Sequence, residues 1–192
     1  MHHLIIPGLN NSGPAHWQSF WAKSLPDTSR VVQRNWDDPK KSEWMETLDQ
    51  AIAGLTSDTI LIGHSLGTVI SALWLTEVYG RGGAVGNAAN GIAANPGARF
   101  VKGAFLVSAS DADSVDIIKD FAPMPLQKMP VPTWLICSED DPFVSMERSK
   151  QFAEAWGAHL ECVGALGHIN AKSNLGEWEQ GRKLLAEFEK TL

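Results

Sequence analysis

The chain has few cysteines, no dense cluster of basic residues and no long apolar run. Its two cysteines, Cys137 and Cys162, are too few for a disulfide framework or a cysteine-based metal site. Each lies within an apolar stretch, so we expect both to be small buried side chains. This cysteine usage favours a reducing compartment and predicts a cytoplasmic protein.

The basic residues also form no dense cluster in the sequence. The formal net charge is −6, and Lys40 and Lys41 form the nearest approach to a basic run. We therefore expect no nucleic-acid partner, because a phosphate backbone would be repelled on average. No apolar stretch approaches the roughly 20 residues of a membrane span. The N-terminal MHHLIIPGLN lacks the basic and apolar regions of a signal peptide, so we expect no membrane partner.

Short apolar runs instead alternate with helical patterns along 192 residues, a length that suits one domain over residues 1–192. Several runs are apolar throughout, which is typical of parallel strands buried on both faces. The alternation predicts an α/β protein, a three-layer α/β/α sandwich around a mostly parallel six-stranded sheet. The expected strands are His3–Ile6, Arg30–Gln33, Thr59–Gly63, Val101–Ser108, Thr133–Ser138 and His159–Val163.

The expected helices carry their own boundary signals. Pro14 is suited to the first turn of one helix, and Ser42 is a candidate N-cap of the next. Ser145 can cap a later helix, which Gly157 would end. The segment 80–99 is rich in Gly, Ala and Asn and predicts a long flexible connection. Because it follows a helix, we expect it away from the carboxyl edge of the sheet.

Ser65 lies in Gly63-His64-Ser65-Leu66-Gly67, which fits the pattern G-x-S-x-G. The match comes directly after an apolar strand and directly before a helical run, as a nucleophile elbow requires. In such a turn the glycines permit close backbone contacts, and the serine is held in a strained conformation. We therefore interpret Ser65 as a candidate nucleophile.

A serine nucleophile needs a base and an acid, and this fold predicts the order Ser, acid, His. Asp141 and His168 follow in that order, each just beyond an expected strand and so at the same sheet edge as Ser65. Asp140 and Asp111 are alternative acids. His64, beside the nucleophile, is expected to be structural.

An oxyanion hole would complete the site. One expected donor is the N–H of Leu66, and the other is the N–H of Leu9 or Asn10 in the loop after the first strand. His16 and Trp17 follow in the same loop-to-helix region and are candidate substrate contacts. The competing interpretation of Trp17 is that its ring packs a helix on the sheet.

These motifs resemble the α/β-hydrolase superfamily and, more narrowly, the small serine hydrolase family that includes retinoblastoma-binding protein nine. The resemblance implies that Ser65, Asp141 and His168 form a catalytic triad. It also implies a compact core with little or no cap, and residues 111–132 are indeed too short for a large lid. The matching segments span almost the whole chain: LIIPGLNNSGPAHWQSFW, GHSLGTVIS, SEDDPFVS and GHIN with the following GEWEQGRKLL.

The sequence therefore predicts a serine hydrolase that cleaves a small-molecule acyl substrate through an acyl-enzyme on Ser65. An ester is the expected substrate, with amides and thioesters as alternatives. This chemistry needs no metal and no organic cofactor, so none is expected. A non-catalytic binding module on the same fold, or an acyltransferase that uses the same triad, are the other functions that the sequence leaves open.

Overall fold

The core of the molecule is a sheet of six parallel strands. The computed structural model describes residues 1–79 and 95–192. The strand order is β2-β1-β3-β4-β5-β6, and every neighbouring pair is parallel. The six strands are β1 (His2–Ile6), β2 (Thr28–Arg30), β3 (Thr59–His64), β4 (Val101–Val107), β5 (Thr133–Cys137) and β6 (His159–Cys162), and all but β2 coincide with the expected strands to within one residue at each end.

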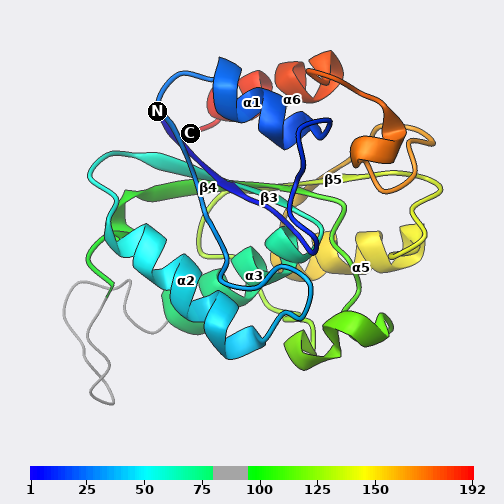
Figure 1. Cartoon of the computed structure of the whole chain (residues 1–192), viewed down its shortest axis with the longest axis horizontal. Coiled ribbons are helices and arrows are strands. Elements are labelled where there is room, and N and C mark those ends of the chain that lie inside the picture. Colours follow the sequence, from blue (N-terminus) through cyan, green and yellow to red (C-terminus); the bar gives the residue numbers. More distant parts are fainter. Residues whose placement is uncertain (80–94) are drawn as a thin grey trace.

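Helices cover both faces of this sheet (Figure 1). On one face lie α1 (Trp17–Ser24) and α6 (Glu179–Glu189), and on the other lie α2 (Lys41–Ala53), α3 (Leu66–Trp74) and α5 (Met146–Trp156). The described residues also form four short helical turns: η1 (Leu75–Tyr79), η2 (Ala98–Phe100), η3 (Asp116–Phe121) and η4 (Ala171–Ser173). The predicted three-layer α/β/α sandwich is confirmed.

The strands supply two apolar cores because successive side chains point to opposite faces. Ile5 of β1 and Phe105 of β4 are buried with Trp21 of α1 on one face. Their neighbours Leu4 and Leu106 are buried on the other face, against α2, α3 and α5. Burial on both faces explains why these strands read as continuous apolar runs.

The observed helix ends agree in part with those predicted from the sequence. Ser145 caps α5 with its side chain, and Gly157 ends the helix with a left-handed φ of 64°, as predicted. Ser42 is not a cap, because α2 already begins at Lys41. The Lys41 N–H instead donates to the Asp120 carboxylate at 2.7 Å. A residue far away in the sequence therefore provides the hydrogen-bond acceptor for the first N–H group of α2.

Two other boundaries differ from the expectation. Pro14 lies in a turn, and α1 begins three residues later, with His16 as its N-cap. The second strand is Thr28–Arg30 and not Arg30–Gln33. β2 is a short polar strand at the edge of the sheet, where it pairs with β1. The prediction was displaced because it followed the apolar residues that come directly after this strand.

Most of the predicted 80–99 connection lies outside the described residues. Within its described part, Asn95 to Gly97 form a turn that leads into η2. The Asn95 side-chain amide donates to the Asp49 carbonyl on α2 at 2.8 Å. None of the helices in residues 1–79 and 95–192 combines the length and the apolar character that crossing a bilayer requires.

Candidate active site

Ser65 lies on the sharp turn that joins β3 to α3. Its backbone adopts φ 57° and ψ −124°, a region that non-glycine residues rarely occupy. The Ser65 N–H donates to the Val107 carbonyl of β4 at 3.0 Å, and the Ser65 carbonyl accepts the Thr68 N–H at 2.9 Å. Hydrogen bonds to a strand and to a helix thus hold the strained turn in place.

Two glycines let this turn pack closely against its surroundings. A Cβ atom on Gly67 would overlap the carbonyl oxygen of Ile6 at the end of β1. A Cβ atom on Gly63 would lie 2.9 Å from the Gly67 carbonyl oxygen, closer than Cβ atoms occur in proteins. The glycines of G-x-S-x-G are therefore required by close backbone contacts, as the sequence predicts.

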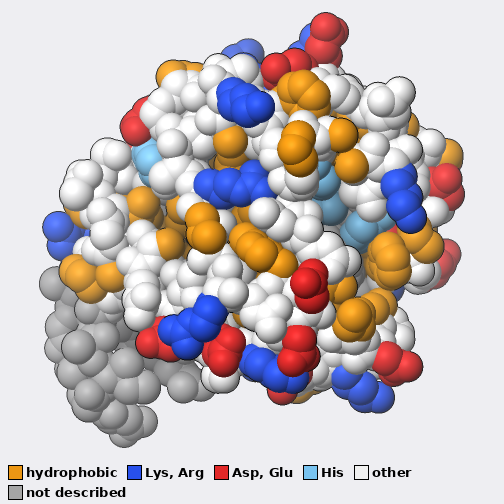
Figure 2. All heavy atoms as spheres, viewed as in Figure 1, with side chains coloured by type: hydrophobic (Ala, Val, Ile, Leu, Met, Phe, Trp, Pro, Cys, Tyr) orange, Lys and Arg blue, Asp and Glu red, His pale blue; other side chains and the backbone are white. Residues whose placement is uncertain are grey.

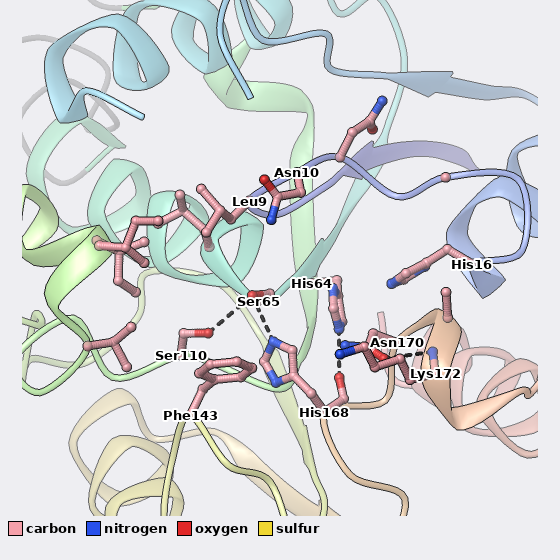
Figure 3. Close-up of a pocket in the computed structure, with 17 residues that line it drawn as sticks. Leu9, Asn10, His16, His64, Ser65, Ser110, Phe143, His168, Asn170 and Lys172 are labelled. Carbon is pink, nitrogen blue, oxygen red and sulfur yellow. Dashed lines mark hydrogen bonds between the residues drawn. The ribbon is translucent and has the colours of Figure 1, made fainter. Parts of the chain in front are cut away.

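The structure brings Ser65, His168 and Asp141 together at the carboxyl edge of the sheet. Ser65 Oγ lies 2.8 Å from His168 Nε2, and His168 Nδ1 lies 2.9 Å from each carboxylate oxygen of Asp141. Figure 3 shows the His168 ring directed at the serine. Because the carboxylate accepts the Nδ1 proton, Nε2 is left to accept the proton of the serine hydroxyl. The Asp141 side chain has no exposed surface, so its contact with His168 is shielded from water.

The two alternative acids have other partners. Asp140 accepts hydrogen bonds from the Gly167 N–H at 2.7 Å and from the Ser138 hydroxyl at 2.9 Å. These bonds lower the pKa of Asp140 and tie together the two loops that carry Asp141 and His168. Asp111 forms an ion pair with Arg148 at 3.0 Å. Of the three candidate acids, only Asp141 contacts the imidazole.

Two buried rings hold the main chain at His168 and Ile169. His64 Nε2–H donates to the His168 carbonyl at 2.9 Å, and the Trp17 indole N–H donates to the Ile169 carbonyl at 2.8 Å. Burial lowers the pKa of His64 well below its ordinary value, so this ring is neutral. Trp17 is 1% exposed and packs against Trp178 in the core. It does not line the cavity, and we therefore withdraw it as a substrate contact.

The loop after β1 lies against the nucleophile elbow. A Cβ atom on Gly8 would lie 2.7 Å from Ser65 Cβ and 3.0 Å from the Leu66 nitrogen. The Asn10 N–H donates to the Trp36 carbonyl at 3.0 Å, so it is not free to bind an oxyanion. This corrects the alternative that placed Asn10 in the hole. Among the described residues, the Leu9 and Leu66 N–H groups have no hydrogen-bond partner.

A cavity of about 340 Å³ opens over Ser65. In the space-filling view, histidine side chains are visible in a hollow of this face, with hydrophobic side chains beside them (Figure 2). One side of the cavity is apolar, and its wall includes residues of the segment before and within η3. The other side is polar and is formed by the loop after β1 and by the region of η4 (Figure 3). The apolar members are Leu9, Leu66, Val115, Ile117, Ile118 and Phe143, and the polar ones include Asn10, Asn11, His16, Asn170 and Lys172.

Of the two expected substrate contacts, His16 does reach the cavity. Sequence reasoning missed Ser110, whose hydroxyl lies 3.1 Å from that of Ser65, and it missed Asn170 and Lys172. The signal available for Ser110 was its place just after a strand, at the same edge as the nucleophile. Within the described residues, no group of three His, Cys, Asp or Glu side chains is arranged to hold a metal ion.

Comparison with known families shows to which family the chain belongs. The family model of the serine hydrolases matches residues 3–187, which is nearly the whole chain. The chain belongs to the serine hydrolase family. In this serine hydrolase of compact α/β-hydrolase fold, Ser65, Asp141 and His168 lie just after the carboxyl ends of β3, β5 and β6.

Solved structures agree with this assignment. A YdeN-like hydrolase from Pectobacterium atrosepticum is 29% identical to this serine hydrolase, with a TM-score of 0.81 over 99% of this chain and 91% of the other. The ydeN gene product of B. subtilis is 21% identical, with a TM-score of 0.77 over 99% of this chain and all of the other, and it supports the fold alone. None of the curated proteins compared with the chain matches it significantly.

Proposed function

We propose that this serine hydrolase cleaves small carboxylic esters through an acyl-enzyme formed on Ser65, with His168 as the base and Asp141 as the acid of a catalytic triad. The observation that carries the proposal is the chain of contacts from Ser65 Oγ to His168 Nε2 at 2.8 Å and from His168 Nδ1 to Asp141 at 2.9 Å. The first distance is short enough for proton transfer from Ser65 to His168, and the second is short enough for Asp141 to orient the imidazole.

In the proposed acylation step, Ser65 Oγ attacks the ester carbonyl while His168 Nε2 takes the hydroxyl proton. Asp141 holds the imidazole in the required tautomer and stabilises the imidazolium that forms. The negative charge develops on the former carbonyl oxygen, for which the free N–H groups of Leu66 and Leu9 are the proposed donors.

The intermediate then collapses, and the C–O bond to the leaving group breaks. His168 gives its proton to the departing alcohol, which leaves the acyl group on Ser65. In the second half of the reaction, His168 takes a proton from water, and the resulting hydroxide attacks the acyl carbonyl. Ser65 recovers its proton from the imidazolium, and the carboxylic acid is released.

The cavity supports a small acyl group. Its volume of about 340 Å³ lies at the lower end of the range of ligand pockets. The apolar side offers branched and aromatic side chains to the acyl chain, among them Ile117 and Phe143, which are 58% and 43% exposed. A short acyl chain would fill this side, whereas a long lipid chain would extend into solvent.

Labelling with a fluorophosphonate probe tests the proposal. We expect the wild-type protein to become labelled, and the Ser65→Ala and His168→Ala variants to lose labelling. Mass spectrometry of the digested wild type should place the adduct on Ser65. Hydrolysis of short-chain esters should be lost in the same two variants.

A matched control separates loss of chemistry from loss of fold. His159→Ala removes a histidine that lies at the opposite end of the sheet, at the start of β6. This variant should be labelled like the wild type. An unlabelled wild type, or a labelled Ser65→Ala variant, would contradict the proposal.

A further inference from the structure

His16 occupies an unusual place in the cavity wall. The residue is 4% exposed, it lines the cavity, and its Nε2 atom is buried without a partner among the described protein atoms. Figure 3 shows the ring directed from the loop after β1 towards the interior of the site, beside His64. Buried polar atoms are normally paired, so an unpaired one that faces a cavity indicates a ligand.

The protonation state of this ring follows from its other nitrogen. His16 Nδ1 accepts the Gln18 N–H at 3.1 Å and so caps α1. A nitrogen that accepts carries no proton, so in the neutral ring the proton is on Nε2. Burial, with a smaller effect of Arg30, lowers the pKa of His16 to about 3. At neutral pH the ring therefore presents an uncharged N–H donor to the cavity.

The neighbouring ring of His64 does not accept a hydrogen bond from His16 Nε2–H. The centroids of His16 and His64 are 4.6 Å apart in an edge-on arrangement, and no hydrogen bond joins the two side chains. Because His64 Nε2–H donates to the His168 carbonyl, the nitrogen of His64 that could accept is Nδ1, and it forms no hydrogen bond with His16. The Nε2–H of His16 is therefore free to bind a substrate atom.

The surroundings of His16 define the kind of atom that it would bind. Asn170 and Lys172 lie on the same polar side of the cavity, away from the apolar wall (Figure 3). Among the described residues that line the cavity, Lys172 is the one Lys or Arg, and none is Asp or Glu. This side thus offers donors and positive charge and has no carboxylate, which suits an oxygen that accepts hydrogen bonds.

We propose that the polar side of the cavity binds the leaving group of the substrate through an acceptor oxygen, and that His16 Nε2–H is the donor that recognises it. The substrate class is then an ester with an apolar acyl part and an alcohol part that carries an ether, hydroxyl or carboxylate oxygen. The inference rests on the proposed function, because the two sides are assigned relative to Ser65. His16 is in this scheme a specificity residue.

A matched pair of esters tests the assignment. Butyl butanoate and 2-methoxyethyl butanoate share the acyl group and differ in one CH2 that is replaced by an ether oxygen. The measured quantity is the ratio of kcat/KM for the methoxyethyl ester to that for the butyl ester. In His16→Asn, the shorter side chain can still accept the Gln18 N–H as an N-cap, but it withdraws the donor from the cavity. We expect the ratio to fall roughly three- to tenfold, the effect of one neutral hydrogen bond.

The ratio excludes a merely structural effect of the substitution, because a general loss of activity affects both esters equally. Ile117→Ala is the matched control on the apolar side, and it should change the preference among acyl chains without changing the ratio. A ratio that stays at the wild-type value in His16→Asn would overturn the inference. A protein that hydrolyses neither ester and resists the fluorophosphonate probe would instead refute the proposed function.

A second measurement does not depend on a variant at position 16. In Ser65→Ala protein with 15N-labelled histidine, NMR should show the His16 proton on Nε2. This signal should shift when 2-methoxyethyl butanoate is added, and it should shift much less with butyl butanoate. A proton on Nδ1, or equal shifts with both esters, would overturn the inference.

Discussion

The Ser110 hydroxyl lies 3.1 Å from the Ser65 hydroxyl, and Figure 3 shows Ser110 and the His168 ring both in contact with Ser65 Oγ. Since the Ser65 proton is directed at His168 Nε2, Ser110 must donate in this contact and Ser65 must accept. Ser65 Oγ is thus held by two hydrogen bonds, one to His168 and one from Ser110.

Replacing Ser110 by Ala should therefore slow acylation. We expect the rate of fluorophosphonate labelling to fall roughly two- to tenfold, which corresponds to the loss of one neutral hydrogen bond. Ser145→Ala is a suitable control, because Ser145 caps α5 and does not line the cavity. It should cost about 1 kcal/mol of unfolding free energy and leave the labelling rate unchanged. Equal labelling rates in wild type and Ser110→Ala would contradict the expected role.

The adjacent carboxylates Asp140 and Asp141 should behave very differently. Asp141→Asn would disturb the tautomer of His168, and kcat for ester hydrolysis should fall about 10⁴-fold. Asp140→Asn keeps an oxygen that can accept the Gly167 N–H, so kcat should change less than about tenfold. Steady-state kinetics of both variants checks this. Similar losses in the two variants would contradict the assignment of the acid.

Gly67 should tolerate no side chain. In Gly67→Ala the new methyl group would overlap the Ile6 carbonyl oxygen, so the turn must move. We expect the free energy of unfolding to fall by at least about 2 kcal/mol. Gly13→Ala is the matched control, because a Cβ atom at Gly13 meets nothing within 4 Å. Urea denaturation measures both variants, and equal stabilities would show that the close contact is not required.

The low pKa of His16 predicts an acid-sensitive fold. The unfolded chain protonates this ring near its ordinary pKa of 6.5, whereas the folded chain does so near 3. Between these pH values the unfolded state binds a proton that the folded state does not. The stability is therefore complete above pH 6.5 and is lost progressively as the pH falls towards 3. At about 1.4 kcal/mol per pKa unit, the total loss is several kcal/mol.

Urea denaturation at pH 7.5 and at about pH 5 checks this linkage. The difference between the two free energies of unfolding should be smaller in His16→Asn than in the wild type. Burial lowers the pKa of His64 in both proteins, and His16 lowers it further in the wild type alone, so this part of the pH dependence is also smaller in His16→Asn. An identical pH dependence in the two proteins would show that His16 is protonated in the folded state as readily as in the unfolded state.

Much of the fold could be predicted from the sequence, because the strands are marked by local apolar runs. The place of Ser65, and of Asp141 and His168 just beyond their strands, followed from the order of elements alone. The capping of α2 could not be predicted, since Asp120 reaches the Lys41 N–H from a distant part of the chain.

The details of the site that were missed also depend on tertiary contacts. A turn residue such as Ser110 carries no motif, and its role depends on the distance to Ser65. Trp17 looked like a pocket residue because it follows the loop at the carboxyl edge of the sheet. Its indole instead bonds to the Ile169 carbonyl, a partner that the sequence does not reveal. The loss of Asn10 as an oxyanion donor depends in the same way on the Trp36 carbonyl.

The carbonyl groups of His168 and Ile169 each accept a hydrogen bond from a buried ring. His64 of β3 donates to the first, and Trp17 of α1 donates to the second. The apolar wall of the cavity, with Ile117 and Val115, takes no part in this anchorage. Substitutions in the apolar wall should therefore alter the acyl preference while leaving intact the hydrogen bonds that position His168. A directed-evolution campaign aimed at acyl specificity should accordingly find its productive substitutions in residues 115–118.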